Sequence, residues 1–332
     1  MKKVVKLLLK IILIIVALIM LVMFAFIKIA EHREANYYNY TQTAGEIEMK
    51  YTAFGDKNVS YMEFNAYDDV IGKYAMWYPR ELENMGEKYP VVIFANGTGS
   101  TSATYKPFME HLASWGFIAI GNDDKNTRSG ASAESTLQFL IQVNEDPDGI
   151  FYHKIDLDNI GIGGHSQGGV AAFNMVTNQE HGFMIKALYA ASATSSYHTG
   201  VMADQWEYNL TEITIPTFLT SGTGYWDAGT AMTKDQVNDE ESNVVQGICP
   251  LWSLQENYTS LSDAIDKVMA RKKNTDHGNS YKQFDGYMTA WFMYYLQGDQ
   301  EAGKAFTNGG ELSANNMYQD VQTTINEQNA KS

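Results

Sequence analysis

The sequence predicts an α/β protein with a mostly parallel central sheet covered by helices on both faces, preceded by one transmembrane helix. Strand and helix patterns alternate from about Val59 onward, which is typical of repeated βα units. Several expected strands are continuous apolar runs, and this pattern indicates strands buried on both faces. The segment 11–27, by contrast, is an uninterrupted apolar run near the N-terminus. Hydrophobic residues make up 45% of the chain, enough for a substantial core.

The expected strands are short runs of apolar and β-branched residues. The first is stopped by Pro79, and the second, 90–95, is apolar throughout. The run 159–163 leads directly into a glycine-rich turn. In chain order, the expected strands cover 73–78, 90–95, 117–120, 159–163, 185–190, 213–220 and 267–270.

The expected helices carry apolar side chains at helical spacing. In the first of them, Phe108, Leu112 and Trp115 fall on one side. Ser132 is an N-cap candidate for the second. The expected helices cover 105–115, 132–143, a segment from Val170 onward and 281–296.

The chain divides into three predicted regions. Four lysines precede the apolar run and Lys28 closes it, so this segment can cross a bilayer with lysines at both ends. The lysines ahead of it place the N-terminus in the cytoplasm and the rest of the chain outside. We expect an uncleaved signal anchor at 1–30, a polar linker at 31–58 and a globular domain at 59–332. A cleaved signal peptide is the alternative, although Lys28 would occupy position −3 if cleavage followed Ala30.

The charge of the chain argues against nucleic-acid partners. The net charge is −15, and the part after residue 30 holds 19 basic and 39 acidic residues, a net charge of −20. Such a body repels nucleic acid and anionic headgroups. Cys249 is the only cysteine, so no intramolecular disulfide can form, and an exported domain without disulfides fits a bacterial protein at the cell membrane.

The sequence also argues against cofactors. No Gly-x-Gly-x-x-Gly motif opens the first βα unit, and no Gly-Lys-Ser/Thr phosphate loop occurs. No cluster of residues with metal-ligand spacing stands out. We therefore expect neither a cofactor nor a metal.

The most informative motif is Gly164-His165-Ser166-Gln167-Gly168. It follows an expected strand and opens an expected helix. A Gly-x-Ser-x-Gly in that setting is a nucleophile elbow, in which glycines permit a tight turn that raises the serine hydroxyl above the sheet edge. A glycine-rich turn with an incidental serine is the alternative interpretation.

A serine nucleophile needs a base and an orienting acid. His277 follows the last expected strand and is the base candidate. Asp227 lies a few residues beyond the strand that ends near Thr220 and is the acid candidate, with Asp235 and Glu240 as competitors. The other histidines lie too early in the chain, or beside the serine, for this role: 32, 111, 153, 165, 181 and 198.

Two backbone amides could stabilise the oxyanion formed during acyl transfer. One is the N–H of Gln167, directly after the nucleophile, and the other is the N–H of Thr98 in the turn after strand 90–95. Glycines at 97 and 99 would let the backbone of that turn approach a substrate carbonyl.

These motifs resemble the α/β-hydrolases of the dienelactone hydrolase, chlorophyllase and cutinase-like esterase group. The segments that carry the resemblance are 91–99, 161–169, 276–278 and 290–292. The resemblance implies a serine esterase with Ser166 as nucleophile, Asp227 as acid and His277 as base. It also implies an oxyanion hole at Thr98 and Gln167. The disulfides of many cutinase-like members are impossible here, and the strand after the elbow's helix ends without the tryptophan of polyester-degrading members.

The expected substrate is a small, neutral ester, lipid-like or apolar. Tyr105, Tyr225, Trp226 and Trp252 could line an aromatic pocket, although core packing is an equal alternative. An acyltransferase or peptidase with the same triad, and a non-catalytic binding protein of this fold at the cell surface, remain as alternative functions.

Overall fold

The computed structural model describes residues 2–84, 86–197, 207–238 and 241–326. The chain forms two compact units, 1–41 and 42–332. The first contains helix α1 (Lys2–Ala35) and the short 3-10 helix η1 (Tyr37–Asn39). Helix α1 is long and apolar enough to cross a membrane, and none of its most apolar stretch is buried by protein. It therefore fits a single transmembrane segment or signal anchor.

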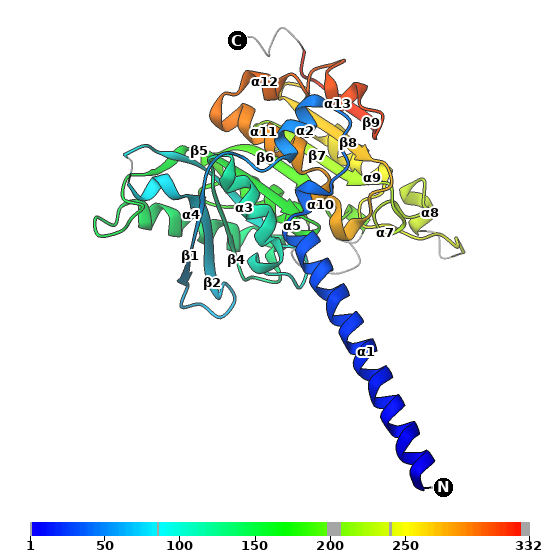
Figure 1. Cartoon of the computed structure of the whole chain (residues 1–332). Coiled ribbons are helices and arrows are strands. Elements are labelled where there is room, and N and C mark those ends of the chain that lie inside the picture. Colours follow the sequence, from blue (N-terminus) through cyan, green and yellow to red (C-terminus); the bar gives the residue numbers. More distant parts are fainter. Residues whose placement is uncertain (1, 85, 198–206, 239–240, 327–332) are drawn as a thin grey trace. The chain divides into compact units, whose positions relative to one another are not determined.

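In the described part of the second unit, nine strands form one sheet in the order β1-β2-β4-β3-β5-β6-β7-β8-β9 (Figure 1). The central strands from β4 to β8 are parallel, whereas β1, β2 and β9 join through antiparallel pairs. This mostly parallel sheet confirms the predicted fold class. The bounds are β1 Val59–Asn65, β2 Lys73–Pro79, β3 Tyr89–Ala95, β4 Ile118–Asn122, β5 Ile155–His165, β6 Ile185–Ala191, β7 Thr217–Gly222, β8 Lys267–Lys272 and β9 Tyr318–Thr323.

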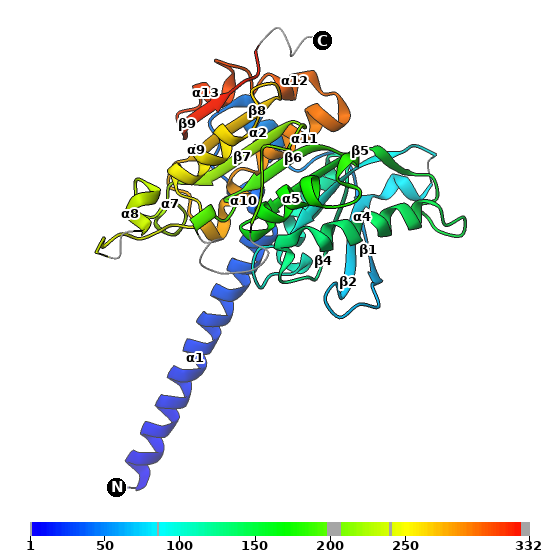
Figure 2. The same ribbon diagram turned by 180° about the vertical axis from the view of Figure 1, so that it is seen from behind.

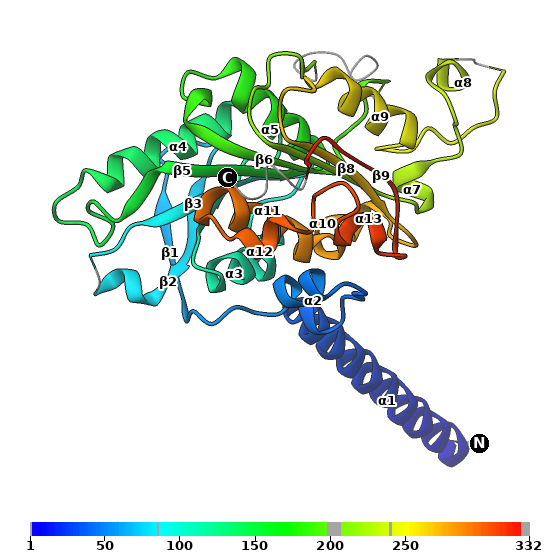
Figure 3. The ribbon, with the colours of Figure 1, turned by 90° about the horizontal axis from the view of Figure 1, so that it is seen from above.

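Helices cover both faces of the sheet. One face carries α4 (Ala131–Asn144), α5 (Gln167–Asn178) and α9 (Leu251–Ser260), as Figure 2 shows from behind. The other carries α3 (Lys106–Ser114) and α11 (Asp285–Gln297), and the two layers are separated by the sheet when seen from above (Figure 3). The short helices are α2 (Glu46–Thr52), α7 (Tyr225–Ala228), α8 (Lys234–Asn238), α10 (Ser280–Gln283), α12 (Gln300–Gly303) and α13 (Glu311–Ala314).

Three expected elements differ from the structure. The strand expected at 213–220 begins only at Thr217, because Ile213 ends a turn in which its N–H donates to the Leu210 carbonyl. Ile213 is nonetheless fully buried, so its apolar character reflects core packing rather than a strand. The helix expected at 105–115 starts as a 3-10 turn (Ser102–Tyr105). The one expected at 281–296 is divided at Phe284 into α10 and α11.

The region expected to be a linker, 31–58, contains the end of α1 and the whole of α2. Glu48 of α2 is buried, and its carboxylate accepts hydrogen bonds from Lys272, Asn315 and Tyr318. The side chain of Glu311 in turn accepts from two backbone N–H groups at the start of α2. These contacts make α2 part of the second unit.

Candidate active site

The strand ends of the parallel sheet bring four loops to one edge. Strands β3 and β5 pair in register at Ala95 and Gly164, and β7 and β8 pair at Gly222 and Lys272. Because these strands are parallel, their carboxyl ends lie at the same edge of the sheet, where ligands of such folds bind. The residues that follow these ends include Thr98, Ser166, Asp227 and His277. We call this the catalytic edge.

Ser166 occupies a tight turn between β5 and α5. Its backbone has φ 61° and ψ −123°, a strained conformation for a residue other than glycine. A Cβ atom at Gly164 would overlap the carbonyl of Gly168, and one at Gly168 would overlap the carbonyl of Ala95. The two glycines of the motif are therefore required sterically, as expected for a nucleophile elbow.

The three predicted triad side chains form one hydrogen-bonded chain. His277 Nε2 lies 3.0 Å from Ser166 Oγ, and His277 Nδ1 lies 3.0 Å from Asp227 Oδ1. A carboxylate can only accept a hydrogen bond, so Nδ1 carries the proton and Nε2 is free to accept from the serine hydroxyl. Asp227 is fully buried, whereas the His277 side chain is 18% exposed. This is the geometry that an activated serine needs.

Polar groups around Asp227 hold its carboxylate in place, and no sequence pattern predicts them. Ser192 Oγ donates to Asp227 Oδ2 at 2.7 Å, and the Gly222 N–H donates to the same oxygen. The side chain of Asp276 accepts from the backbone N–H groups of Asp227 and His277, at 2.8 and 2.9 Å. Asp276 thus links the backbone at Asp227 to the backbone at His277, whereas the imidazole ring of His277 is bound by Asp227.

His165, next to Ser166 in the chain, is buried, and its ring nitrogens contact residues other than the nucleophile. Its Nε2 lies 2.9 Å from the His277 carbonyl, and its Nδ1 lies 3.3 Å from the Tyr105 hydroxyl. Burial lowers the pKa of His165 to about 3, and the neighbouring His277 adds to this effect. The neutral ring therefore donates from Nε2 to the His277 carbonyl and accepts at Nδ1.

The turn that carries Thr98 is also held firmly. The Gly97 N–H donates to the Tyr105 hydroxyl at 2.9 Å, and a Cβ at Gly97 would lie 3.0 Å from that oxygen. The backbone N–H of Gly99 and the side-chain amide of Gln167 both donate to the Lys125 carbonyl. Within the described residues, the backbone N–H groups of Thr98 and Gln167 have no protein acceptor. Their role as oxyanion donors stays a prediction.

The four predicted pocket residues lie in different environments. Tyr105 is buried, and its ring packs against Phe94 and Tyr281. Tyr225 and Trp226 are 55% and 67% exposed, so neither side chain is enclosed. Trp252 is half-buried on α9. The pocket that these residues were expected to form stays a prediction.

Asp235, a competing acid candidate, and Cys249, the single cysteine, lack the surroundings that an orienting acid or a nucleophile requires. Asp235 is exposed on α8, and Glu240 lies outside the described residues. Cys249 is fully buried, and burial raises the pKa of its thiol well above the ordinary value, which suits a core residue rather than a nucleophile. His198 also lies outside the described residues.

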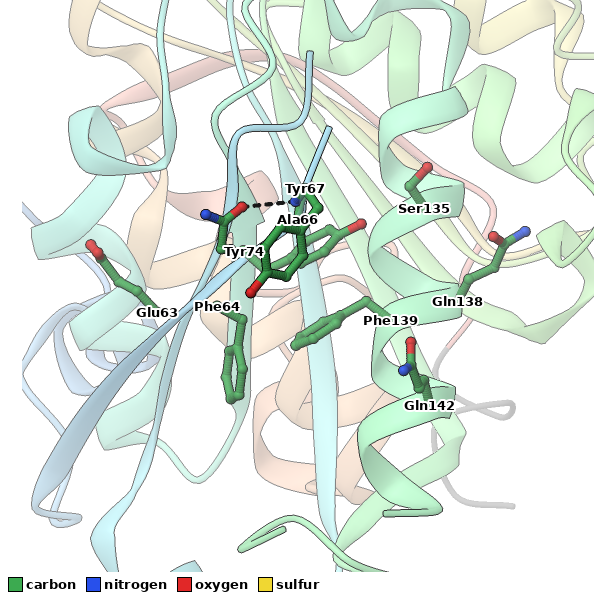
Figure 4. Close-up of a pocket in the computed structure, with 10 residues that line it drawn as sticks. Glu63, Phe64, Ala66, Tyr67, Tyr74, Ser135, Gln138, Phe139 and Gln142 are labelled. Carbon is green, nitrogen blue, oxygen red and sulfur yellow. Dashed lines mark hydrogen bonds between the residues drawn. The ribbon is translucent and has the colours of Figure 1, made fainter. Parts of the chain in front are cut away.

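Two other polar features lie away from the triad. A groove of about 580 Å³ runs between β1 and α4, where Tyr74 stacks on Phe139 (Figure 4), and none of the predicted site residues lines it. Glu134, Glu180 and His181 lie close enough to hold a metal ion. However, Glu134 already accepts hydrogen bonds from the ring and the backbone of His181. Burial alone would raise the pKa of Glu134, but these bonds outweigh it and lower the pKa.

The sheet, the elbow and the order of the loops are those of the α/β-hydrolase fold. Comparison with family models agrees with this fold: residues 81–191 match the model of the family Chlorophyllase, which belongs to the α/β-hydrolase-like group with dienelactone hydrolases and cutinase-like esterases. The matched segment contains Thr98, Ser166 and Gln167 but ends before Asp227 and His277. No curated protein matched the chain.

Proposed function

We propose that the protein is a serine hydrolase that cleaves carboxylic esters through an acyl-enzyme intermediate. The observation that carries this proposal is the hydrogen-bonded chain from Ser166 through His277 to Asp227, with 3.0 Å at each step. The match of residues 81–191 to the Chlorophyllase family supports hydrolysis as the reaction class. A metal or cofactor has no part in the proposed steps.

In the first half of the proposed reaction, Ser166 Oγ attacks the ester carbonyl while its proton passes to His277 Nε2. Asp227 stabilises the imidazolium that results. The negative charge on the former carbonyl oxygen is met by the backbone N–H groups of Thr98 and Gln167. The intermediate then collapses, the C–O bond to the alcohol breaks, and the alcohol leaves with the proton from His277.

In the second half, water attacks the acyl group on Ser166. His277 takes a proton from that water, and the second tetrahedral intermediate breaks the bond to Oγ. The proton returns to Oγ and the carboxylic acid is released. His165 keeps the backbone of His277 in place throughout, because it is neutral and donates to that carbonyl.

The proposed substrates are neutral esters with apolar groups. The net charge of −20 after residue 30 disfavours anionic substrates near the body. The proposed location is the cell membrane, with α1 as a single-pass anchor and residues 42–332 on the extracytoplasmic side. The lysines at the N-terminus support this orientation.

The test is a Ser166→Ala variant of the full-length chain. We expect it to lose labelling by a fluorophosphonate probe and to hydrolyse short p-nitrophenyl esters at least about 1,000-fold more slowly. Ser129→Ala, at a half-exposed serine before α4, is the matched control and should keep both properties. Labelling that survives in Ser166→Ala would exclude Ser166 as the nucleophile. Adding alcohol or amine acceptors to the assay would reveal a transferase by its products.

A further inference from the structure

The chain enters the second unit at its catalytic edge. Lys272, the last residue of β8, donates from Nζ to the carbonyl of Gln42 at 2.9 Å. The same Nζ donates to the carbonyl of Gln283, at the end of the short helix that follows His277. Gln42 is the first residue of the unit. The start of the unit and the segment of the proposed base are therefore held by one buried lysine.

An exposed aromatic pair adjoins the same edge. Tyr225 and Trp226 directly precede Asp227, and their ring centroids are 5.5 Å apart. The backbone around them is bound to the His277 loop, because the Gly224 N–H donates to the Thr275 carbonyl at 2.7 Å. With 55% and 67% of their surfaces exposed, these two rings project from a fixed position beside the triad. Tyr and Trp are the residues that favour the boundary between headgroups and acyl chains.

The covalent chain keeps this edge near the segment that can span a membrane. Only residues 36–41 separate the end of α1 from Gln42. Six residues extend over about 20 Å at most. With the helical residues 28–35 that follow the apolar run, the chain can hold Gln42 at most roughly 30 Å from a bilayer that α1 spans.

We propose that the catalytic edge docks on the bilayer that holds α1, with Tyr225 and Trp226 in the headgroup region, and that the substrate is a neutral ester dissolved in that bilayer. The docking surface does not depend on the reaction, whereas the substrate class rests on the proposed esterase function. The acidic body selects zwitterionic or neutral lipids over anionic ones, because its net charge of −20 repels the latter. The ester then reaches Ser166 by lateral diffusion rather than from water.

The docking surface can be tested by fluorescence in vesicles. The full-length chain is reconstituted in phosphatidylcholine with bromine atoms on the upper part of the acyl chains, which quench nearby indoles on contact. We expect quenching in the wild type and its clear reduction in Trp226→Phe. Trp115→Phe is the matched control, because Trp115 precedes β4 at the opposite edge of the sheet. The fluorescence of this variant should be quenched as strongly as that of the wild type. Equal quenching in Trp226→Phe and wild type would overturn the docking surface.

The substrate class needs a second measurement. A long-chain ester that does not exchange between vesicles is placed either in the vesicles that hold the protein or in separate ones. We expect hydrolysis in the first case and at least a tenfold lower rate in the second. Equal rates would overturn the membrane-dissolved substrate. Fluorophosphonate labelling of the same samples separates this result from failure of the proposed function, because an unreactive Ser166 would abolish labelling and both rates while leaving the quenching unchanged.

Discussion

At the scale of single residues, strain and hydrogen bonding concentrate around Asp227 and Ser166. Ser192 follows β6 and, like Ser166, has a positive φ, 47° against 61°. Residues other than glycine adopt such angles at a cost of about 1–3 kcal/mol, which the surrounding structure must offset. At Ser192 this conformation directs the hydroxyl to Asp227 Oδ2, to which it donates at 2.7 Å, and Ser192 Oγ also lies 2.8 Å from Ser280 Oγ. We infer that Ser192 positions the acid.

Replacing Ser192 by alanine should therefore slow the reaction without weakening substrate binding. The variant leaves Asp227 with one fewer donor, so its carboxylate holds the His277 ring less firmly. We expect kcat for a p-nitrophenyl ester to fall about tenfold, with KM unchanged, since the lost bond costs about 1.5 kcal/mol. Steady-state kinetics measures both constants. Ser196→Ala, whose hydroxyl contacts the exposed side chains of Glu256 and Lys234, is the control. A rise in KM with unchanged kcat would contradict the positioning role.

The buried ring of His165 should be neutral in the folded protein at ordinary pH. Because burial lowers its pKa to about 3, the ring should stay neutral from pH 5 to pH 9, with its proton on Nε2. Nitrogen-15 NMR of the imidazole should show one neutral tautomer over this range, and the same ring should titrate near pH 6.5 in urea. The unfolded chain binds a proton between pH 6.5 and 3 that the folded protein does not bind. The free energy of unfolding therefore falls as the pH drops through this window, and His165 contributes no pH dependence above it. A folded-state titration near pH 6.5 would contradict this account.

At the scale of elements, α2 shows how distant residues determine local structure. Its seven residues are too few to form a stable helix alone. Two features of the second unit hold it: Glu311 binds the first N–H groups of the helix, and Glu48 pairs with Lys272 at 2.8 Å with both side chains buried. Burial lowers the pKa of Lys272, and the nearby Glu48 carboxylate opposes that shift. The polar, tyrosine-rich segment was expected to be a linker because none of these partners is close in sequence.

Glu48→Gln should thus destabilise the protein strongly. The change leaves the Lys272 ammonium buried without its carboxylate, which costs about 3–5 kcal/mol. Chemical denaturation should show this as a lower midpoint with an unchanged slope. Glu46→Gln, at an exposed position of the same helix, should change the free energy of unfolding by less than about 0.5 kcal/mol. The double variant Glu48→Gln/Lys272→Met should recover much of the loss. No recovery would show that the cost lies elsewhere.

At the scale of the whole molecule, the sequence predicts the architecture well and the supporting contacts poorly. The continuous apolar runs of β3 and of the first residues of β4 are strong local signals, because strands buried on both faces need such residues. The order of serine, acid and histidine predicted which three loops would meet, and the structure brings those side chains together. Their catalytic roles remain to be tested.

Other contacts of the site could not be predicted, for a physical reason. Ser192 and Asp276 both bind Asp227, which the pairing of strands far apart in sequence brings to them. The edge strand β9 was missed because its half-buried, polar residues lack the alternation that indicates a strand. The solvent exposure of Tyr225 and Trp226 could not be predicted either. The sequence shows that both are aromatic, but not that both side chains are exposed.

The residue at which the folded unit begins can be tested by comparing two truncated chains, 42–332 and 59–332. The sequence predicts a domain that starts at residue 59, whereas compact contacts begin at Gln42. A chain of 42–332 keeps α2, Glu48 and the Gln42 carbonyl that accepts from Lys272. We expect it to unfold in one cooperative step and to react with a fluorophosphonate probe as the full-length protein does.

A chain of 59–332 loses all of these partners at once. Removal of α2 leaves Lys272 uncompensated and exposes the apolar surface of α11 on which α2 packs. Since a domain is stable by only about 5–15 kcal/mol, this deletion should yield an aggregated or partly unfolded protein. Thermal unfolding followed by circular dichroism compares the two chains. If 59–332 melted at the same temperature as 42–332, α2 would be a passive linker, and the contacts through Lys272 would not contribute to stability.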